Sequence, residues 1–237
     1  MNLLTRDRSI SARRRAEARA TALIVDARQG GCAIARSLAQ QGFAVAFGYA
    51  PIDAGAAART VAAIAATGGR ALAVEMGGTD ETAFAHLLDQ AEEIFGLIDV
   101  LVDNGAADVP SRSAEDELFD RYFGVALRGM VEVVREAAPR LRSGGSIVHL
   151  SRACAGEAPR TQAWMTPHAA LEWLTRTFAA ELARYDVRIN AIAPSADCGE
   201  AAIAEAVALL LGADGDDCNG QVFDVGAAAL RAIGASA

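Results

Sequence analysis

The residues with the chemistry for catalysis or ligand binding gather in two neighbouring stretches, HLSRACAG (149–156) and WMTPHAAL (164–171). His168 carries a side chain that can act as a general base near neutral pH, and Arg152 could bind a carboxylate or a phosphate. Trp164, four positions before His168, can only donate a hydrogen bond. A histidine at the surface or at a helix cap is the commoner case, so these residues form a site only if the fold brings them together.

The composition excludes several kinds of chemistry. All 22 basic residues are arginine, so no lysine is present to form a Schiff base or to tune a catalytic tyrosine. The 4 cysteines form no CxxC pair and do not fall at metal-ligand spacing with the 3 histidines, so we expect no metal site. A net charge of −8 argues against a general nucleic-acid binder. No apolar run is long enough to span a membrane, and without an apolar secretory segment we expect a cytoplasmic protein.

Residues 1–20 differ in composition from the rest of the chain. The charge run predicts a solvated, partly helical extension or a contact arm for an acidic partner. Residues 21–237 contain no repeat and no linker, so we expect one domain there. The segment 1–20 holds six arginines: Arg6, Arg8, Arg13, Arg14, Arg15 and Arg19.

Apolar runs typical of strands alternate with amphipathic stretches typical of helices. Most of the apolar runs lack a period of two, which indicates strands buried on both faces of a parallel sheet. Alternation of this kind predicts an α/β fold with helices on both faces of the sheet. The expected strands are 21–25, 44–49, 70–76, 98–104, 145–151, 186–194 and 220–225. The expected helices are 31–41, 54–67, 80–95, 114–141, 166–184 and 201–211.

Three stretches resemble the short-chain dehydrogenase/reductase family: GGRALAVEMGGTDETAFAHLLDQAEEIFGLIDVLVDN (68–104), AALEWLTRTFAAELARYDVRINAIAP (169–194) and GQVFDVGA (220–227). The resemblance covers about residues 20–230. It implies a single Rossmann-type domain with a doubly wound parallel sheet flanked by helices. It also implies an NAD(P)-dependent oxidoreductase, provided that the functional positions of the family are kept.

The positions that bind the cofactor in that family are altered. A Rossmann site needs a glycine-rich turn that admits the pyrophosphate to the next helix N-terminus. Here the turn reads VDARQGGCAIA, Asp26 stands at the first glycine position, and only Gly30 and Gly31 remain. The aspartate that meets the adenine matches Gly77, whereas Asn104 is kept from the Asn-Asn-Ala-Gly turn. Asp26 would repel a pyrophosphate at low dielectric, although an acidic residue there is also a good helix cap. We therefore expect no cofactor in this chain.

The catalytic positions of the family are replaced as well. By the resemblance, Ala126 stands where the family has its proton-relay asparagine, and Arg152 stands where it has the serine that orients the substrate. Trp164 replaces the tyrosine acid/base, and His168 replaces the lysine that accompanies it. Hydride transfer to a carbonyl needs a group that moves a proton near neutral pH, and tryptophan has none. Pro167 suits the first helical position and would leave Trp164 in the preceding loop. We therefore expect no catalytic residue at these positions.

The substrate lid is shortened, whereas the assembly helix of the family is retained. Pro194 leads almost directly into the last helix, so that roughly twenty residues of loop and lid are absent. The family packs its long helix, here near 166–184, against neighbouring subunits. The resemblance therefore implies an interface formed by the apolar stripe of Leu171, Leu174 and Phe178.

These observations favour a non-catalytic subunit that assembles with an active, NAD(P)-binding relative in a hetero-oligomer and supports it. Two-subunit members of the family in which one subunit has lost its site are the precedent. One alternative is a regulatory, ligand-sensing module on the same fold. The other is an atypical enzyme with a rebuilt site that draws on His168, Arg152, His149, Asp103 or Asp197.

Overall fold

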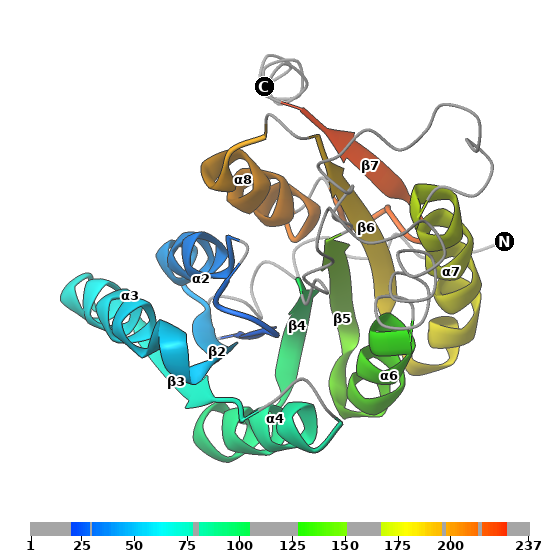
Figure 1. Cartoon of the computed structure of the whole chain (residues 1–237). Coiled ribbons are helices and arrows are strands. Elements are labelled where there is room, and N and C mark those ends of the chain that lie inside the picture. Colours follow the sequence, from blue (N-terminus) through cyan, green and yellow to red (C-terminus); the bar gives the residue numbers. More distant parts are fainter. Residues whose placement is uncertain are drawn as a thin grey trace, which may run out of the picture.

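Seven parallel strands form one sheet in the order β3-β2-β1-β4-β5-β6-β7 (Figure 1). This computed structural model of the chain describes residues 20–28, 30–77, 81–104, 128–150, 167–195, 198–212 and 215–226. The order confirms the Rossmann-type doubly wound sheet that the sequence predicts. The strands are β1 (Thr21–Ile24), β2 (Ala44–Tyr49), β3 (Arg70–Glu75), β4 (Ile98–Asp103), β5 (Leu141–Leu150), β6 (Arg188–Pro194) and β7 (Val222–Val225).

Helices cover both faces of the sheet, and a separate apolar core fills each side. The first core joins the sheet to α2, α3 and α8, and the second joins it to α4, α6 and α7 (Figure 1). The helices are α2 (Gly31–Gln40), α3 (Ala54–Ala66), α4 (Glu81–Phe95), α6 (Arg128–Ala137), α7 (Pro167–Leu182) and α8 (Glu200–Leu210).

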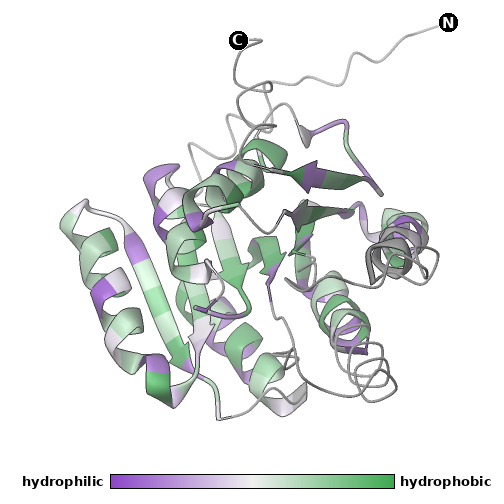
Figure 2. Ribbon diagram, turned by 45° about the horizontal axis from the view of Figure 1, so that its top comes forward, coloured by the Kyte–Doolittle hydropathy of each residue, from purple (hydrophilic) through white to green (hydrophobic). Residues whose placement is uncertain are grey.

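The central strands are apolar because both of their faces are buried. Successive side chains of a strand point to opposite faces, so that Ile24 enters the core under α2 and α8, while Leu23 enters the core under α4 and α6. In β4, Val102 likewise enters the core under α2 and α8, and Leu101 enters the core under α4 and α6. Figure 2 shows hydrophobic strands between helices whose surfaces are mixed. This two-sided burial explains why the strand sequences lack alternation.

The observed element boundaries lie close to the predicted ones, with one clear difference. The predicted helix 114–141 ends as an α-helix at Ala137, passes through a 3-10 turn (Ala138–Arg140), and β5 begins at Leu141 rather than at 145. Pro139 has no amide hydrogen and cannot continue the α-helical ladder, which explains this early end. The helix predicted from 166 begins with Pro167 as its first residue. Residues 1–19 and 114–127 lie outside the described residues.

Candidate functional site at the carboxyl ends of the central strands

Four of the five altered or retained cofactor positions of the family lie at the carboxyl ends of β1 and β4. Strand β1 pairs with β2 on one side and β4 on the other, so the order of the strands reverses here. This reversal is where open α/β sheets bind ligands. The structure brings Asp26, Gly30 and Gly31 of the turn after β1 together with Asn104, which directly follows β4.

Asn104 holds the turn after β1 in its conformation. Its side-chain oxygen accepts a hydrogen bond from the Asp26 amide (3.0 Å), and its Nδ2 donates to the carbonyl oxygens of Asp26 (2.6 Å) and Arg28 (3.0 Å). Asn104 is buried, with 1% of its surface exposed, so these bonds form out of water. A buried amide side chain whose donors and acceptor are satisfied makes a rigid local structure.

The Asp26 carboxylate is bound within its own turn. The backbone amide of Arg28 donates to Oδ1 of Asp26 (2.8 Å), and the guanidinium of Arg28 donates to Oδ2 from Nη2 (2.7 Å) and Nε (3.0 Å). The Asp26 side chain is 15% exposed and that of Arg28 is 35% exposed. Asp26 therefore does not cap the following helix, since its carboxylate binds Arg28 instead.

The first amides of α2 are also bound within the turn. Gly31 donates to the Arg28 carbonyl (2.9 Å), Cys32 to the Ala27 carbonyl (3.0 Å) and Ala33 to the Gly30 carbonyl (2.9 Å). A helix N-terminus binds phosphate through amides that have no partner inside the helix. These three amides have backbone partners within the turn, whereas a phosphate-binding helix start presents amides without such partners.

Gly31 is needed for close packing rather than for an unusual backbone angle. A Cβ atom at this position would lie 1.8 Å from the Asp26 carbonyl oxygen and 2.9 Å from Nδ2 of Asn104. Its neighbour Gly30, the N-cap of α2, has φ of 85° and takes the left-handed conformation that favours glycine. The two glycines that the sequence analysis found thus have structural roles in the turn itself.

A buried acid–base pair joins the next two strands. Nδ1 of His149 in β5 lies 2.7 Å from Oδ2 of Asp103, the last residue of β4. Their side chains are 11% and 3% exposed, and the two residues are directly paired in the sheet. Both lie on the same face as Leu101 and Ile147, two positions earlier in each strand, and therefore on the side of α4, α6 and α7. A carboxylate in this position orients an imidazole ring.

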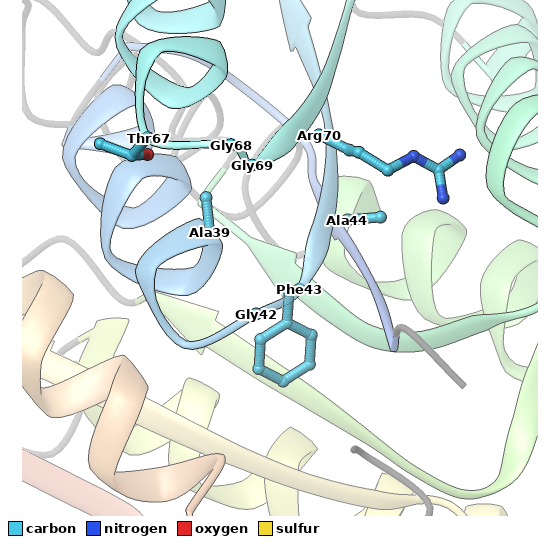
Figure 3. A pocket seen from close by; sticks show the side chains of 8 residues that line it. All are labelled: Ala39, Gly42, Phe43, Ala44, Thr67, Gly68, Gly69 and Arg70. Carbon is cyan, nitrogen blue, oxygen red and sulfur yellow. The ribbon is translucent and has the colours of Figure 1, made fainter. Parts of the chain in front are cut away.

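Other candidate sites in the described part of the chain are weak. A hollow opens at the amino ends of β2 and β3, the opposite edge of the sheet, where α2 and α3 end (Figure 3). The negative ends of two helices disfavour a phosphate there. No three His, Cys, Asp or Glu residues of the described segments could hold a metal ion, and no helix within them is long and apolar enough to cross a membrane. The hollow is lined by Ala39, Gly42, Phe43, Ala44, Thr67, Gly68, Gly69 and Arg70.

Comparison with known proteins identifies the family of this chain. The sequence model described as enoyl-(acyl carrier protein) reductase matches residues 27–198. The chain belongs to the short-chain dehydrogenase/reductase family. Among solved members, it is similar to the short-chain dehydrogenase/reductase of Serratia marcescens BCRC 10948, with a TM-score of 0.74, 26% identity, and coverage of 87% of this chain and 96% of that one. A short-chain dehydrogenase from Burkholderia cenocepacia J2315, solved in complex with NADP, has a TM-score of 0.72 and 27% identity, with coverage of 87% of this chain and 96% of that one.

Curated short-chain dehydrogenase/reductases match a shorter region of the chain. The hydroxynaphthalene reductase-like protein Arp2 of Metarhizium acridum is 34% identical over 178 residues, which are 73% of this chain and 66% of that protein. The versicolorin reductase stcU of Emericella nidulans is 34% identical over 181 residues, 74% of this chain and 68% of that protein. The chain thus matches slightly less than two thirds of the length of Arp2.

The remaining predicted positions of the family are only partly described. Gly77 follows β3 in an exposed position, and nothing lies within 4 Å of where its Cβ would be. Ala126, Arg152 and Trp164 lie outside the described residues. His168 is the second residue of α7, but its side chain is not among those described.

The apolar stripe predicted on the assembly helix faces the sheet where it is described. Phe178 is 7% exposed and belongs to the core beneath α4, α6 and α7, and Leu174 packs against this core. The side chain of Leu171 is not described, and the interface formed by the stripe stays a prediction. Trp173, which sequence reasoning missed, is 66% exposed on the outer side of α7. The sequence did offer one signal for this exposure: Trp173 directly precedes the stripe residue Leu174, so it lies about 100° away from it around the helix.

Proposed function

We propose that this chain is a non-catalytic subunit that assembles with an active, NAD(P)-dependent short-chain dehydrogenase/reductase and supports it. The observation that carries the proposal is the turn after β1, in which the first amides of α2 donate to backbone carbonyl oxygens and Arg28 binds the Asp26 carboxylate. A member of this family that cannot hold the dinucleotide has no source of hydride. Its relatives are named as reductases or reductase-like proteins, and the proposal concerns how this chain departs from them.

The replaced catalytic positions support the same conclusion. Trp164 and His168 stand where the family has its tyrosine and lysine, and the chain contains no lysine at all. The connection between β6 and α8 consists only of residues 195–199. A connection of this length leaves no room for a lid that would exclude water from a substrate. The turn at the cofactor position, the acid/base positions and the lid are thus all altered in this chain.

The outer face of α7 supports a role in assembly. Trp173 is exposed there, and Arg176 and Ala180 are exposed one and two turns further along the helix. Trp and Arg are the residues most enriched among those that dominate binding energy at protein interfaces. A closed two-fold assembly of this family can accept a close relative in place of a second copy. We expect the partner to hold the NAD(P), and the complex to reside in the cytoplasm.

Co-expression with an intact relative from the same genome tests the proposal. The relative should carry the glycine-rich turn and the Tyr-x-x-x-Lys motif. Native mass spectrometry should detect a mixed dimer or tetramer, and the relative expressed alone should lose stability or turnover. Separate homo-oligomers together with an unimpaired relative would show that the proposal is wrong.

The Asp103–His149 pair favours a second candidate function, an enzyme with a rebuilt acid–base site. An imidazole oriented by a carboxylate at the carboxyl ends of two strands is a recurring catalytic arrangement. The test is proton exchange at the carbon next to the carbonyl of small ketones, followed in D2O without added nucleotide, because an acid–base pair alone can move protons. Under this candidate, any turnover should be lost in His149→Gln and kept in His86→Gln, because His86 is exposed on α4. Turnover that survives in His149→Gln would exclude the pair as its source.

A further inference from the structure

The first strand starts directly beside the last residue of α4. The hydroxyl of Thr21, the first residue of β1, donates to the carbonyl oxygen of Phe95 (3.5 Å), and the Thr21 amide donates to Oδ2 of Asp99 (2.8 Å). Phe95 is the last residue of α4. Residues 1–19, which contain the arginine run, therefore connect to the fold at the C-terminal end of this helix.

Negative charge gathers at this end of α4. The C-terminus of a helix carries a partial negative charge that basic side chains normally offset, but the last turn of α4 contains none. Asp89 and Glu93 are exposed and lie one turn apart on the same face of the helix. Arg140 binds Asp89, whereas Glu93 accepts a hydrogen bond from Gln90 (3.3 Å) and forms no ion pair with any other described residue. A further cation at this end would be stabilising.

The surface beside these carboxylates suits an arginine side chain. Ile94 and Leu97 are large apolar residues that are 51% and 52% exposed. One arginine already binds here from β3: the guanidinium of Arg70 lies over the ring of Phe95 (4.7 Å) and donates to the Ile94 carbonyl oxygen (3.4 Å). An arginine combines an apolar stem with a charged group that donates several hydrogen bonds, so it can cover apolar surface and bind oxygens at once.

The arginine run is within reach of this surface. Arg13, Arg14 and Arg15 precede Thr21 by six to eight positions. That many residues span roughly 20 to 28 Å when extended. Helix α4 has 15 residues and is therefore about 22 Å long. Starting beside Phe95, the run can contact any part of the exposed face of α4.

We propose that the arginine-rich segment 6–19 docks on its own chain, at the exposed C-terminal surface of α4 formed by Asp89, Glu93, Ile94 and Leu97. The segment holds six arginines and two acidic residues, so its charge is opposite to that of the surface. Its arginines supply the positive charge that the last turn of α4 lacks, and their stems cover the two apolar side chains. This inference does not depend on the assembly proposal.

A single lysine introduced into the segment tests the docking. The chain contains no lysine, so Arg15→Lys keeps the charge and adds one side-chain amine. A carbodiimide joins an amine to a carboxylate that is in contact with it, and mass spectrometry locates the bond. We expect position 15 to couple to Asp89 or Glu93 within one chain, with at least roughly threefold less product in about 1 M NaCl, because salt screens exposed charges. Arg59→Lys, exposed on α3 across the sheet, is the matched control and should not couple to these residues.

Trypsin cleavage after Arg13, Arg14 and Arg15 gives an independent measure. Glu93→Gln removes one charge from the surface and adds no cleavage site. We expect cleavage within the segment to become roughly two- to fivefold faster, as the loss of one exposed ion pair implies. Glu205→Gln removes the same charge at an exposed position of α8 and should be cleaved at the wild-type rate.

The contrary results are equally specific. Coupling between two chains would place the segment on a second copy. Coupling of position 15 only to other carboxylates, or to none, would show that the segment does not dock on α4. Equal cleavage rates in the wild type and Glu93→Gln would show that Glu93 does not bind the segment. Circular dichroism confirms that each variant is folded.

Discussion

The pair of Asp103 and His149 has a geometry that fits either a structural or a catalytic role. Two ionisable groups lie out of water at 2.7 Å, at the strand ends where this fold places its chemistry. Burying such a pair is expensive, and its net contribution to stability depends on how well each partner satisfies the other. Measurements of stability and of activity separate the two roles.

Removal of one partner should destabilise the protein, and neutralising the other should restore part of the loss. We expect His149→Leu to lower the free energy of unfolding by on the order of 3 kcal/mol, because the Asp103 carboxylate loses a buried hydrogen-bond partner. Adding Asp103→Asn should recover about 1 kcal/mol, since an amide is less costly to bury than a charge. Urea denaturation measures the wild type, both single variants and the double variant. His86→Leu, on the exposed side of α4, serves as the control and should change little.

If the double variant changes the free energy of unfolding by the sum of the two single changes, the two residues are not coupled. In that case the short distance contributes nothing measurable to stability. Retention of the pair would then need a functional reason, and the rebuilt-enzyme candidate would gain support.

At the scale of elements, the turn between β1 and α2 depends on a close approach of two backbones. Gly31→Ala would place a methyl group 1.8 Å from the Asp26 carbonyl oxygen, so the start of α2 would have to move. We expect a loss of about 2 to 3 kcal/mol in unfolding free energy. Gly77→Ala is the matched control and should stay within about 0.5 kcal/mol, because its Cβ meets nothing within 4 Å. Equal stabilities of the two variants would mean that α2 does not pack as described.

The elements themselves could be predicted from the sequence, because the signals for them are local. Apolar runs without alternation indicated strands buried on both faces, and Pro167 indicated the start of α7. The one boundary error, at β5, arose where a 3-10 turn at Pro139 ends the helix before the apolar run begins.

The details of the site could not be predicted because they depend on distant contacts. Asn104 holds the turn at Asp26 across 78 positions of sequence. Asp26 was expected to act near a phosphate or as a cap, but its ion pair with Arg28 depends on the conformation of the turn. Spacing in the sequence carries no information on any of these.

At the scale of the whole molecule, two apolar cores hold the described part of the fold together. Each face of the sheet is covered by its own set of helices in the part of the chain that is described. The assembly proposal needs only this scaffold, since a fold can be kept while its chemistry changes.

The assembly proposal predicts opposite results for two neighbouring residues of α7. Trp173→Glu should leave the chain folded and weaken the mixed complex, because Trp173 is 66% exposed on the outer face of the helix. Leu174→Glu should instead destabilise the chain itself by about 2 to 4 kcal/mol, because Leu174 packs against the core and a charge there would be buried. Circular dichroism during thermal unfolding measures the fold, and native mass spectrometry measures the complex. A folded Leu174→Glu chain that fails to assemble would indicate that the stripe of Leu171, Leu174 and Phe178 forms the interface. A Trp173→Glu chain that assembles normally would show that the outer face of α7 is not the contact surface.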